Sequence, residues 1–299
     1  MRYRPFARAG MAVSAICLVL DGGTATATAD HWRDLVHAAL EEGVNAFEIV
    51  RPSPELLRGL AQGAAAVARK LLFVGLRAPP DADAARLAGW VEATIGAAGV
   101  GDLDLLSLDA ERSLPTGAPA MLRALKDQGL ARRLAIAGDG ELLAEHVRAG
   151  AFDALITPFN LLSGWRERHM IRLAAEAQMA VIGSDACPAA VATLAEAARA
   201  AARTIRRSRR EPLAGAGSYA FLEATRGWSA EQLCIGYALT EPALATVRIQ
   251  ARDREHLAAL ARITERDLPA AVSAQIEMAR FSAERASGVE RRSQIRRSA

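Results

Sequence analysis

Three charged side chains stand at or near the carboxyl ends of three successive strands that the sequence predicts. Glu48 lies inside the first apolar run, Arg77 follows the second and Asp109 follows the third. Because the carboxyl ends of parallel strands meet at one face of a barrel, these side chains could form an acid/base cluster there. The alternative is a set of ion pairs that fills this face without chemistry, since no Tyr, His or Cys accompanies them as proton donor or nucleophile.

Two arginines follow a later strand. Arg252 lies between the apolar run Thr246–Ile249 and a predicted helix, and Arg254 is the first residue of that helix. A guanidinium can hold phosphate oxygens through two parallel hydrogen bonds, so both are candidates for binding a cofactor. The alternative is a solvated helix start. Asn160, in the sequence PFNLLS, is a further candidate for the cofactor site, although an Asn in such a loop also positions backbone groups.

These residues need a scaffold, and the apolar runs predict strands that alternate with helices. The predicted strands are Val44–Val50, Leu71–Leu76, Leu103–Leu108, Arg133–Ala137, Phe152–Thr157, Ala180–Gly183 and Thr246–Ile249. The predicted helices are His31–Glu42, Pro54–Ala68, Asp83–Ala98, Ala118–Gln128, Glu141–Arg148, Glu167–Gln178, Ser229–Leu239, Arg254–Ile263 and Leu268–Phe281. Such alternation indicates an α/β fold with a parallel sheet and helical crossovers.

The length of the chain favours a closed barrel. At 299 residues we expect a (β/α)8 TIM barrel rather than an open doubly wound sheet. No GxGxxG sequence follows the first predicted strand, which argues against a Rossmann fold. The pattern places seven barrel strands and leaves the eighth unassigned.

The two ends of the chain have features of their own. Tyr3–Phe6 and Val13–Leu18 flank Ala9-Gly10 and predict an N-terminal β-hairpin. The same region has the basic start, apolar run and small-residue pattern of a secretory signal peptide, so secretion is an alternative to the cytoplasmic location that we expect. We assign residues 1–282 to one barrel domain and residues 283–299 to a disordered, Arg-rich tail.

Positive charge is concentrated in two segments. The formal net charge is +3, yet the run Arg203–Arg210 and the tail each carry five arginines, so the rest of the chain is acidic. This distribution argues against a face that binds nucleic acid. Pro188–Arg210 is predicted to be one long helix, followed by a Gly-rich loop over Glu211–Arg226. The arginine run fits either a solvated helix end or a docking patch for an acidic partner protein.

Cysteine and histidine give no support for a metal. Cys17, Cys187 and Cys234 are scattered, without the spacing of a metal site or a redox motif, which is typical of a reducing compartment. The five histidines are also dispersed. No segment approaches the roughly 20 apolar residues of a membrane span. We therefore expect neither a metal nor a membrane anchor.

The chain resembles the aldo/keto reductases in several segments that occur in the family's order. YRPFARAGMAVSAICL resembles the family's N-terminal hairpin, and Glu42–Leu57 is similar to its first strand and the turn beyond. GDLDLLSLD, ALKDQGLARRLAIAG and FDALITPFNLLS resemble its third to fifth strands. EPALATVRIQARDREHLAAL is similar to its seventh strand and cofactor-phosphate loop. The resemblance covers about residues 3–265 and implies a barrel whose mouth binds NAD or NADP.

The departures from the family concern its catalytic residues. The family uses an Asp, a Tyr, a Lys and a His to reduce carbonyls, and the Tyr donates the proton. Here Glu48 stands at the Asp position, Arg77 at the Lys position and Asp109 at the His position, and no Tyr follows Glu48 in the next turn. An arginine stays protonated and cannot replace a tunable lysine. The nicotinamide site departs from the family too. Where the family has Ser-Asn, Gln and Gly, this chain has Ala137-Gly138, Ile156 and Gln250. The aromatic ring that stacks on nicotinamide in the family is missing from the segment GSDACP.

The resemblance and its departures together imply a catalytically degenerate member of the family. We expect a regulatory pseudoenzyme that acts through protein contacts and still senses NAD(H) or NADP(H). One bacterial regulator of cell division is an oxidoreductase homologue of this kind, so the resemblance implies cell division as the setting. The alternative is an active NAD(P)H-dependent oxidoreductase with rearranged catalytic residues.

Overall fold

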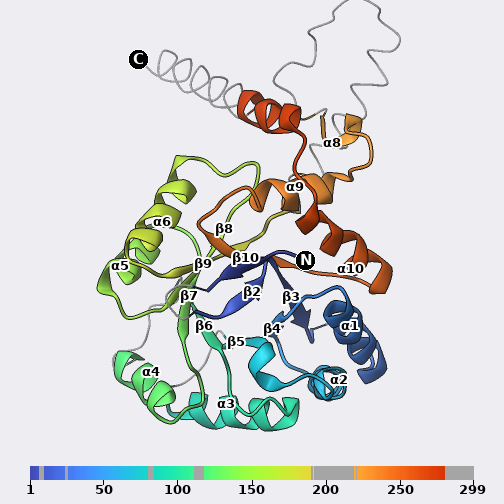
Figure 1. Ribbon diagram of the computed structural model, residues 1–299. Helices are drawn as coiled ribbons and strands as arrows, with labels where there is room; N and C mark the ends of the chain where they lie inside the picture. Colours follow the sequence, from blue (N-terminus) through green and yellow to red (C-terminus); the bar gives the residue numbers. More distant parts are fainter. Residues whose placement is uncertain are drawn as a thin grey trace, which may run out of the picture.

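Eight parallel strands close into a barrel that helices surround (Figure 1). The computed structural model describes residues 1–6, 10–23, 26–79, 84–110, 118–189, 191, 219 and 221–279. Around the barrel the strands follow the order β10-β3-β4-β5-β6-β7-β8-β9, and each pair of neighbours is parallel. The prediction of a (β/α)8 barrel is confirmed.

The elements have the following bounds. The strands are β1 Tyr3–Pro5, β2 Ala12–Ser14, β3 Ile16–Asp21, β4 Ala46–Val50, β5 Phe73–Arg77, β6 Leu105–Asp109, β7 Leu134–Ala137, β8 Ala154–Pro158, β9 Ala180–Ser184 and β10 Leu244–Ile249. The helices are α1 Ala29–Glu41, α2 Pro54–Ala64, α3 Ala84–Ala98, α4 Ala118–Asp127, α5 Glu141–Ala149, α6 Trp165–Glu176, α8 Phe221–Ala224, α9 Ala230–Ala238 and α10 Arg254–Ala261. Short 3-10 helices cover Arg69–Leu71 and Arg262–Glu265, and residues 270–279 are also helical.

The eighth barrel strand lies where the sequence predicts only a hairpin strand. The run Val13–Leu18 divides at Ala15 into β2, which pairs with β1, and β3, which pairs with β4 and β10. Both parts are mostly apolar because β3 and the last two residues of β2 are buried, so no polar residue other than Ser14 marks the division. Treating this run as one hairpin strand is therefore wrong, and every later strand moves up one place around the barrel.

The N-terminal hairpin itself is confirmed, and it closes the amino-terminal end of the barrel. Phe6 follows β1, is fully buried, and lies with its ring centroid 4.7 Å from that of Phe73. The barrel interior near this amino-terminal end contains Phe6 together with small and apolar side chains from all eight barrel strands. Six of them are alanines: Ala46, Ala135, Ala137, Ala154, Ala180 and Ala245. A second, larger core fills the space between the outside of the strands and the helices.

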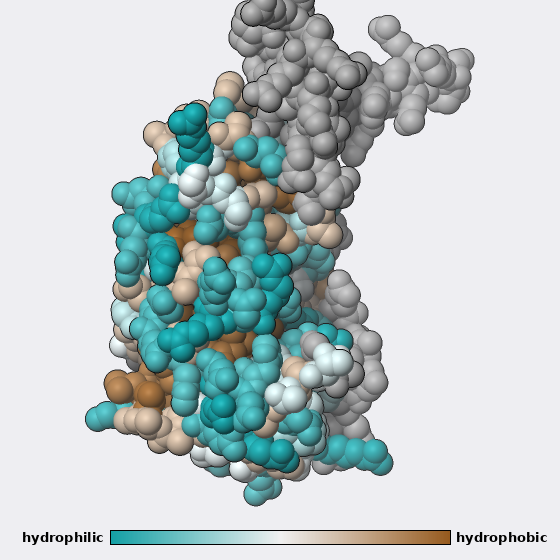
Figure 2. Space-filling model, turned by 90° about the vertical axis from the view of Figure 1, so that its right-hand side faces the viewer, coloured by the Kyte–Doolittle hydropathy of each residue, from teal (hydrophilic) through white to brown (hydrophobic). Residues whose placement is uncertain are grey.

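Most other predicted segments agree with the structure or lie outside the described residues, and one differs. Residues 221–224, predicted as loop, form the short helix α8. The long helix Pro188–Arg210, apart from residues 188, 189 and 191, lies outside the described part of the chain, and so does the tail 283–299. In Figure 2, the visible described surface is mostly hydrophilic, with hydrophobic residues in separate small patches. Among the described helices, none has the length and apolar character that crossing a membrane requires.

Candidate functional site

Four charged side chains lie inside the barrel at the carboxyl ends of its strands. They are Glu48 of β4, Arg77 of β5, Asp109 of β6 and Arg248 of β10. Arg77 pairs with Asp109, and the Nε atom of Arg248 lies 2.5 Å from Oε2 of Glu48. The structure thus brings together the three predicted residues and adds a fourth, so that the charges form two ion pairs.

Glu48 is the most enclosed of these groups. It is only 5% exposed, and burial raises its pKa above the usual value. The charges of Arg248 and Arg77 and the hydroxyl of Ser107 act in the opposite direction. A buried carboxyl with a raised pKa has the property expected of a general acid, although the same property occurs in structural ion pairs.

Arg248 is a site residue that the sequence interpretation missed. The sequence signal is the same as for Glu48, since Arg248 is the one charged residue in a mostly apolar strand, LATVRI. It pairs with Glu48 across the intervening strand β3, where Cys17 is the register partner of Arg248. An arginine side chain that faces the barrel interior needs a carboxylate partner there, because a buried unpaired charge is costly in free energy.

No tyrosine lines the pockets described below. Of the chain's three tyrosines, Tyr3 donates its hydroxyl to the carbonyl of Gly43. Tyr237, on α9, accepts a hydrogen bond from Arg168 and stacks on Phe159. Tyr219 has its ring 6.0 Å from that of Phe221.

The chain's two lysines are also placed elsewhere. Lys70 lies in the turn before β5 and Lys126 pairs with Asp153, which comes immediately before β8. Both positions are at the amino-terminal ends of their strands, opposite the charged cluster. The mouth of the barrel therefore has no lysine beside Glu48 or Asp109.

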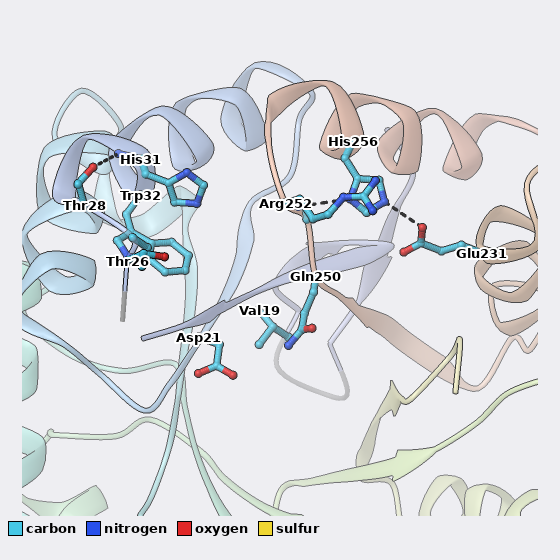
Figure 3. A pocket seen from close by; sticks show the side chains of 12 residues that line it. Val19, Asp21, Thr26, Thr28, His31, Trp32, Glu231, Gln250, Arg252 and His256 are labelled. Atoms are coloured by element: carbon cyan, nitrogen blue, oxygen red, sulfur yellow. Dashed lines mark hydrogen bonds and ion pairs between the residues drawn. The ribbon is translucent and has the colours of Figure 1, made fainter. Parts of the chain in front are cut away.

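A pocket of about 660 Å³ opens beside the charged cluster, between β3, β10 and the helices α1, α9 and α10 (Figure 3). Its lining residues are Val19, Asp21, Thr26, Ala27, Thr28, His31, Trp32, Glu231, Gln250, Ala251, Arg252 and His256. In Figure 3, Asp21 and Gln250 lie near the strand ends, with His31 and Trp32 on the α1 side and Arg252 and His256 on the α10 side.

His256 connects two walls of this pocket. Its Nδ1 accepts a hydrogen bond from the backbone N–H of Arg252 at 3.3 Å, and its Nε2 lies 2.9 Å from Oε2 of Glu231 (Figure 3). Since Nδ1 accepts, Nε2 carries the proton in the neutral ring and donates it to Glu231. Both ring nitrogens are engaged, so His256 holds α9 and the β10–α10 loop together. The sequence interpretation missed this pair because its members come from different helices.

A second pocket of about 390 Å³ adjoins the first and shares Val19, Glu231 and Gln250 with it. Its other lining residues are Ser184, Asp185, Ala186, Cys187, Ile235, Arg248 and Ile249. It therefore reaches from the first pocket toward the end of β9 and touches the charged cluster through Arg248. Both volumes lie in the range of known small-molecule sites.

The predicted cofactor residues have different positions. Arg252 lines the larger pocket and makes no ion pair with a described residue. Arg254 is exposed and pairs with Glu41 of α1, and it does not line either pocket. Asn160 is buried, donates its side-chain amide to the carbonyl of Asp185 and accepts from the N–H of Leu162.

These residues fit a dinucleotide in size and in part in charge. Arg252 and the amino end of α1 at Thr28 are available to phosphate oxygens. The carboxylates of Asp21 and Glu231 line the same pocket, but Asp21 pairs with Arg51 and Glu231 faces His256. In the described part of the chain, no group of three or more His, Cys, Asp or Glu side chains is placed to hold a metal ion.

Comparisons with known proteins identify the fold. No family model matches the sequence, and no curated protein matches it. Among solved structures, the chain is similar to the aldo-keto reductase AKR11C1 from Bacillus halodurans in its holo form, with a TM-score of 0.71 and 15% sequence identity. The match covers 93% of this chain and 95% of that one. The fold is therefore the TIM-barrel fold of aldo-keto reductases.

Proposed function

We propose that this chain is a catalytically degenerate relative of the aldo-keto reductases, acting in the cytoplasm as a regulatory protein through protein contacts. The larger pocket beside β10 serves as a sensor of NAD(H) or NADP(H). The finer form of the proposal is a regulator of the KidO type, which links a bound dinucleotide to cell division.

The observation that carries this proposal is the pairing of charges at the barrel mouth. Arg77 and Asp109, which stand at the family's Lys and His positions, neutralise each other. Glu48, at the family's Asp position, is paired with Arg248. Carbonyl reduction needs a proton donor within reach of the substrate oxygen, and none of the chain's tyrosines lines the pockets. An arrangement of closed ion pairs supports a structural role for these charges.

Retention of a dinucleotide site rests on Arg252. Its guanidinium lines a pocket of suitable volume and has no ion-pair partner among the described residues, so it can bind a phosphate without first breaking an ion pair with any of them. When bound, the dinucleotide would supply a hydride, but this chain's own residues offer only binding and orientation. Arg252 would hold phosphate, and Asp21 and Gln250 present acceptors and donors suited to hydroxyl groups.

A calorimetric titration of the full chain with NADH and with NADPH tests the sensor. We expect binding that Arg252→Ala weakens roughly ten- to hundredfold, the range of a hydrogen bond to a charged group. Arg254→Ala is the matched control, because Arg254 follows the same strand but pairs with Glu41 outside the pocket. Equal losses in both variants, or no binding of either dinucleotide, would remove the sensor from the proposal.

The second candidate is an active oxidoreductase with rearranged catalytic residues. It is favoured by Glu48, whose buried carboxyl has a raised pKa and lies beside the second pocket's Arg248. A steady-state assay with NADH or NADPH and reactive aldehydes distinguishes the two. Turnover that Glu48→Gln or Asp109→Asn abolishes would establish the enzyme, and the regulatory proposal expects no turnover above the rate without protein.

A further inference from the structure

The carboxylates and guanidinium groups that line the two pockets are paired, with two exceptions of opposite sign. The paired groups are Asp21 with Arg51, Glu231 with His256 and Arg248 with Glu48. Arg252 in the larger pocket and Asp185 in the second pocket make no ion pair with a described residue. Because the pockets adjoin and share lining residues, one elongated ligand can extend from Arg252 to Asp185.

The backbone around Asp185 is fixed by hydrogen bonds from the segment after β8. Asp185 directly follows β9 and has a φ angle of 49°, in the left-handed region that few residues other than glycine, Asn and Asp adopt. The buried side-chain amide of Asn160 donates to the carbonyl of Asp185 at 3.0 Å. The backbone N–H of Phe159 donates to the carbonyl of Ser184 at 2.9 Å. These two bonds hold the strand end that presents the Asp185 carboxylate to the second pocket.

The two unpaired charges select a ligand by its charge distribution. A group that lies against Arg252 is favoured if it is an anion such as phosphate. A group that reaches Asp185 is favoured if it is a cation, since opposite charges attract and no described cation already occupies that carboxylate. Partial burial raises the pKa of Asp185 above the usual carboxyl value, and a bound cation would favour its ionised form.

We infer that Asp185 is a specificity residue that makes the oxidised dinucleotide, NAD⁺ or NADP⁺, the preferred ligand over the reduced form. This inference rests on the proposed dinucleotide sensor. With the phosphates at Arg252, the nicotinamide ring extends into the second pocket toward Asp185. The oxidised ring is a pyridinium cation and gains from the carboxylate, whereas the reduced ring is neutral and does not. The site would therefore report the ratio of oxidised to reduced dinucleotide.

The test is a calorimetric titration of the full chain with NAD⁺, NADH, NADP⁺ and NADPH at pH 8 and about 150 mM salt, where long-range charge effects are screened. We expect the oxidised form to bind about fivefold more tightly than its reduced form, the upper end for an ion pair that stays partly exposed. Asp185→Asn keeps the shape of the side chain and removes its charge. It should weaken binding of the oxidised form until the two affinities are equal.

Asp139→Asn is the matched control. Asp139 is an exposed aspartate that follows β7, and it lines neither of the two pockets, so this variant should keep the preference. Equal affinities in wild type, tighter binding of the reduced form, or a preference that survives in Asp185→Asn would each overturn the inference and leave the sensor in place. Absence of binding by all four dinucleotides would remove both.

Discussion

Arg248 and Glu48 form an ion pair across β3, with Nε of the arginine 2.5 Å from Oε2 of the glutamate. Both side chains face the barrel interior and both are largely buried, at 13% and 7% side-chain exposure. Removing one partner would leave the other charge in a site with little water. Two inward-facing positions at the barrel mouth are therefore occupied by an ion pair.

The first prediction concerns the energy of this pair. Arg248→Met should lower the free energy of unfolding by about 3–5 kcal/mol, because it removes the guanidinium that offsets the burial of the Glu48 carboxyl. Glu48→Gln keeps a neutral group of the same shape at that position and should cost less. The double variant should lose clearly less than the sum of the two, since the unpaired charge is gone. Urea unfolding of the four proteins at neutral pH measures the coupling. Arg51→Met, which breaks an ion pair with a mostly exposed arginine, should change stability little. Additive losses in the double variant would show that the two charges act independently.

The second prediction follows from the raised pKa of Glu48. The folded chain holds the Glu48 proton more tightly than the unfolded chain does, so this residue's contribution to stability is fully present below its usual pKa near 4.5. It is lost as pH rises through the raised pKa of the folded state. Unfolding free energies measured from about pH 5 to pH 8 should therefore show the advantage of wild type over Glu48→Gln shrinking as pH rises.

Asp21 gives a control of opposite sign for that pH series. The hydrogen bond from Arg51 lowers the pKa of Asp21, so its contribution is present above the usual carboxyl pKa and is lost as pH falls through the lowered value. Asp21→Asn should differ from wild type by a constant amount over the same pH range. A wild-type advantage over Glu48→Gln that grows with pH would contradict the raised pKa.

The sequence predicts most of the fold because the helices and strands alternate with clear apolar runs. It fails at β2 and β3, where one buried run serves two elements and only the bend at Ala15 divides them. The apolar pattern reports burial, and both strands are buried, so it contains no information about their pairing partners.

The candidate site was predictable to the extent that charges interrupt apolar strands. Glu48 stands out in this way, and Arg248 carries the same signal. His256 and Glu231 could not be paired from the sequence, because they join elements that only the closing of the barrel brings together. Short spacing is the only contact signal that a single sequence offers, and this pair has none.

The third prediction concerns the packing that positions Trp32 in the larger pocket. Gly59 of α2 lies against α1, and a Cβ there would stand 2.5 Å from Cβ of Trp32 and 2.6 Å from the carbonyl oxygen of Ala29. Gly59→Ala should therefore cost about 1–3 kcal/mol of unfolding free energy, as overpacking does. Gly89→Ala is the matched control, since Gly89 lies in the exposed interior of α3 with no atom within 4 Å of a built Cβ. It should stabilise the chain by about 0.5–1 kcal/mol.

Thermal unfolding of both glycine variants measures the difference. Since Trp32 lines the pocket, tryptophan fluorescence should also change in Gly59→Ala. Two variants of equal stability would mean that α1 and α2 separate without cost.

The fourth prediction tests whether the hairpin is an integral part of the barrel. Phe6 fills the amino-terminal end of the barrel against Phe73, so Phe6→Ala should lower the free energy of unfolding by about 3–5 kcal/mol, the range for removing a buried aromatic ring. Tyr3 belongs to the same hairpin but is 51% exposed, and Tyr3→Phe removes only its hydrogen bond to Gly43, so this variant should lose about 1 kcal/mol. Urea unfolding monitored by far-UV circular dichroism compares the two. If Phe6→Ala unfolds at the same urea concentration as Tyr3→Phe, the hairpin is an appendage and the barrel closes without it.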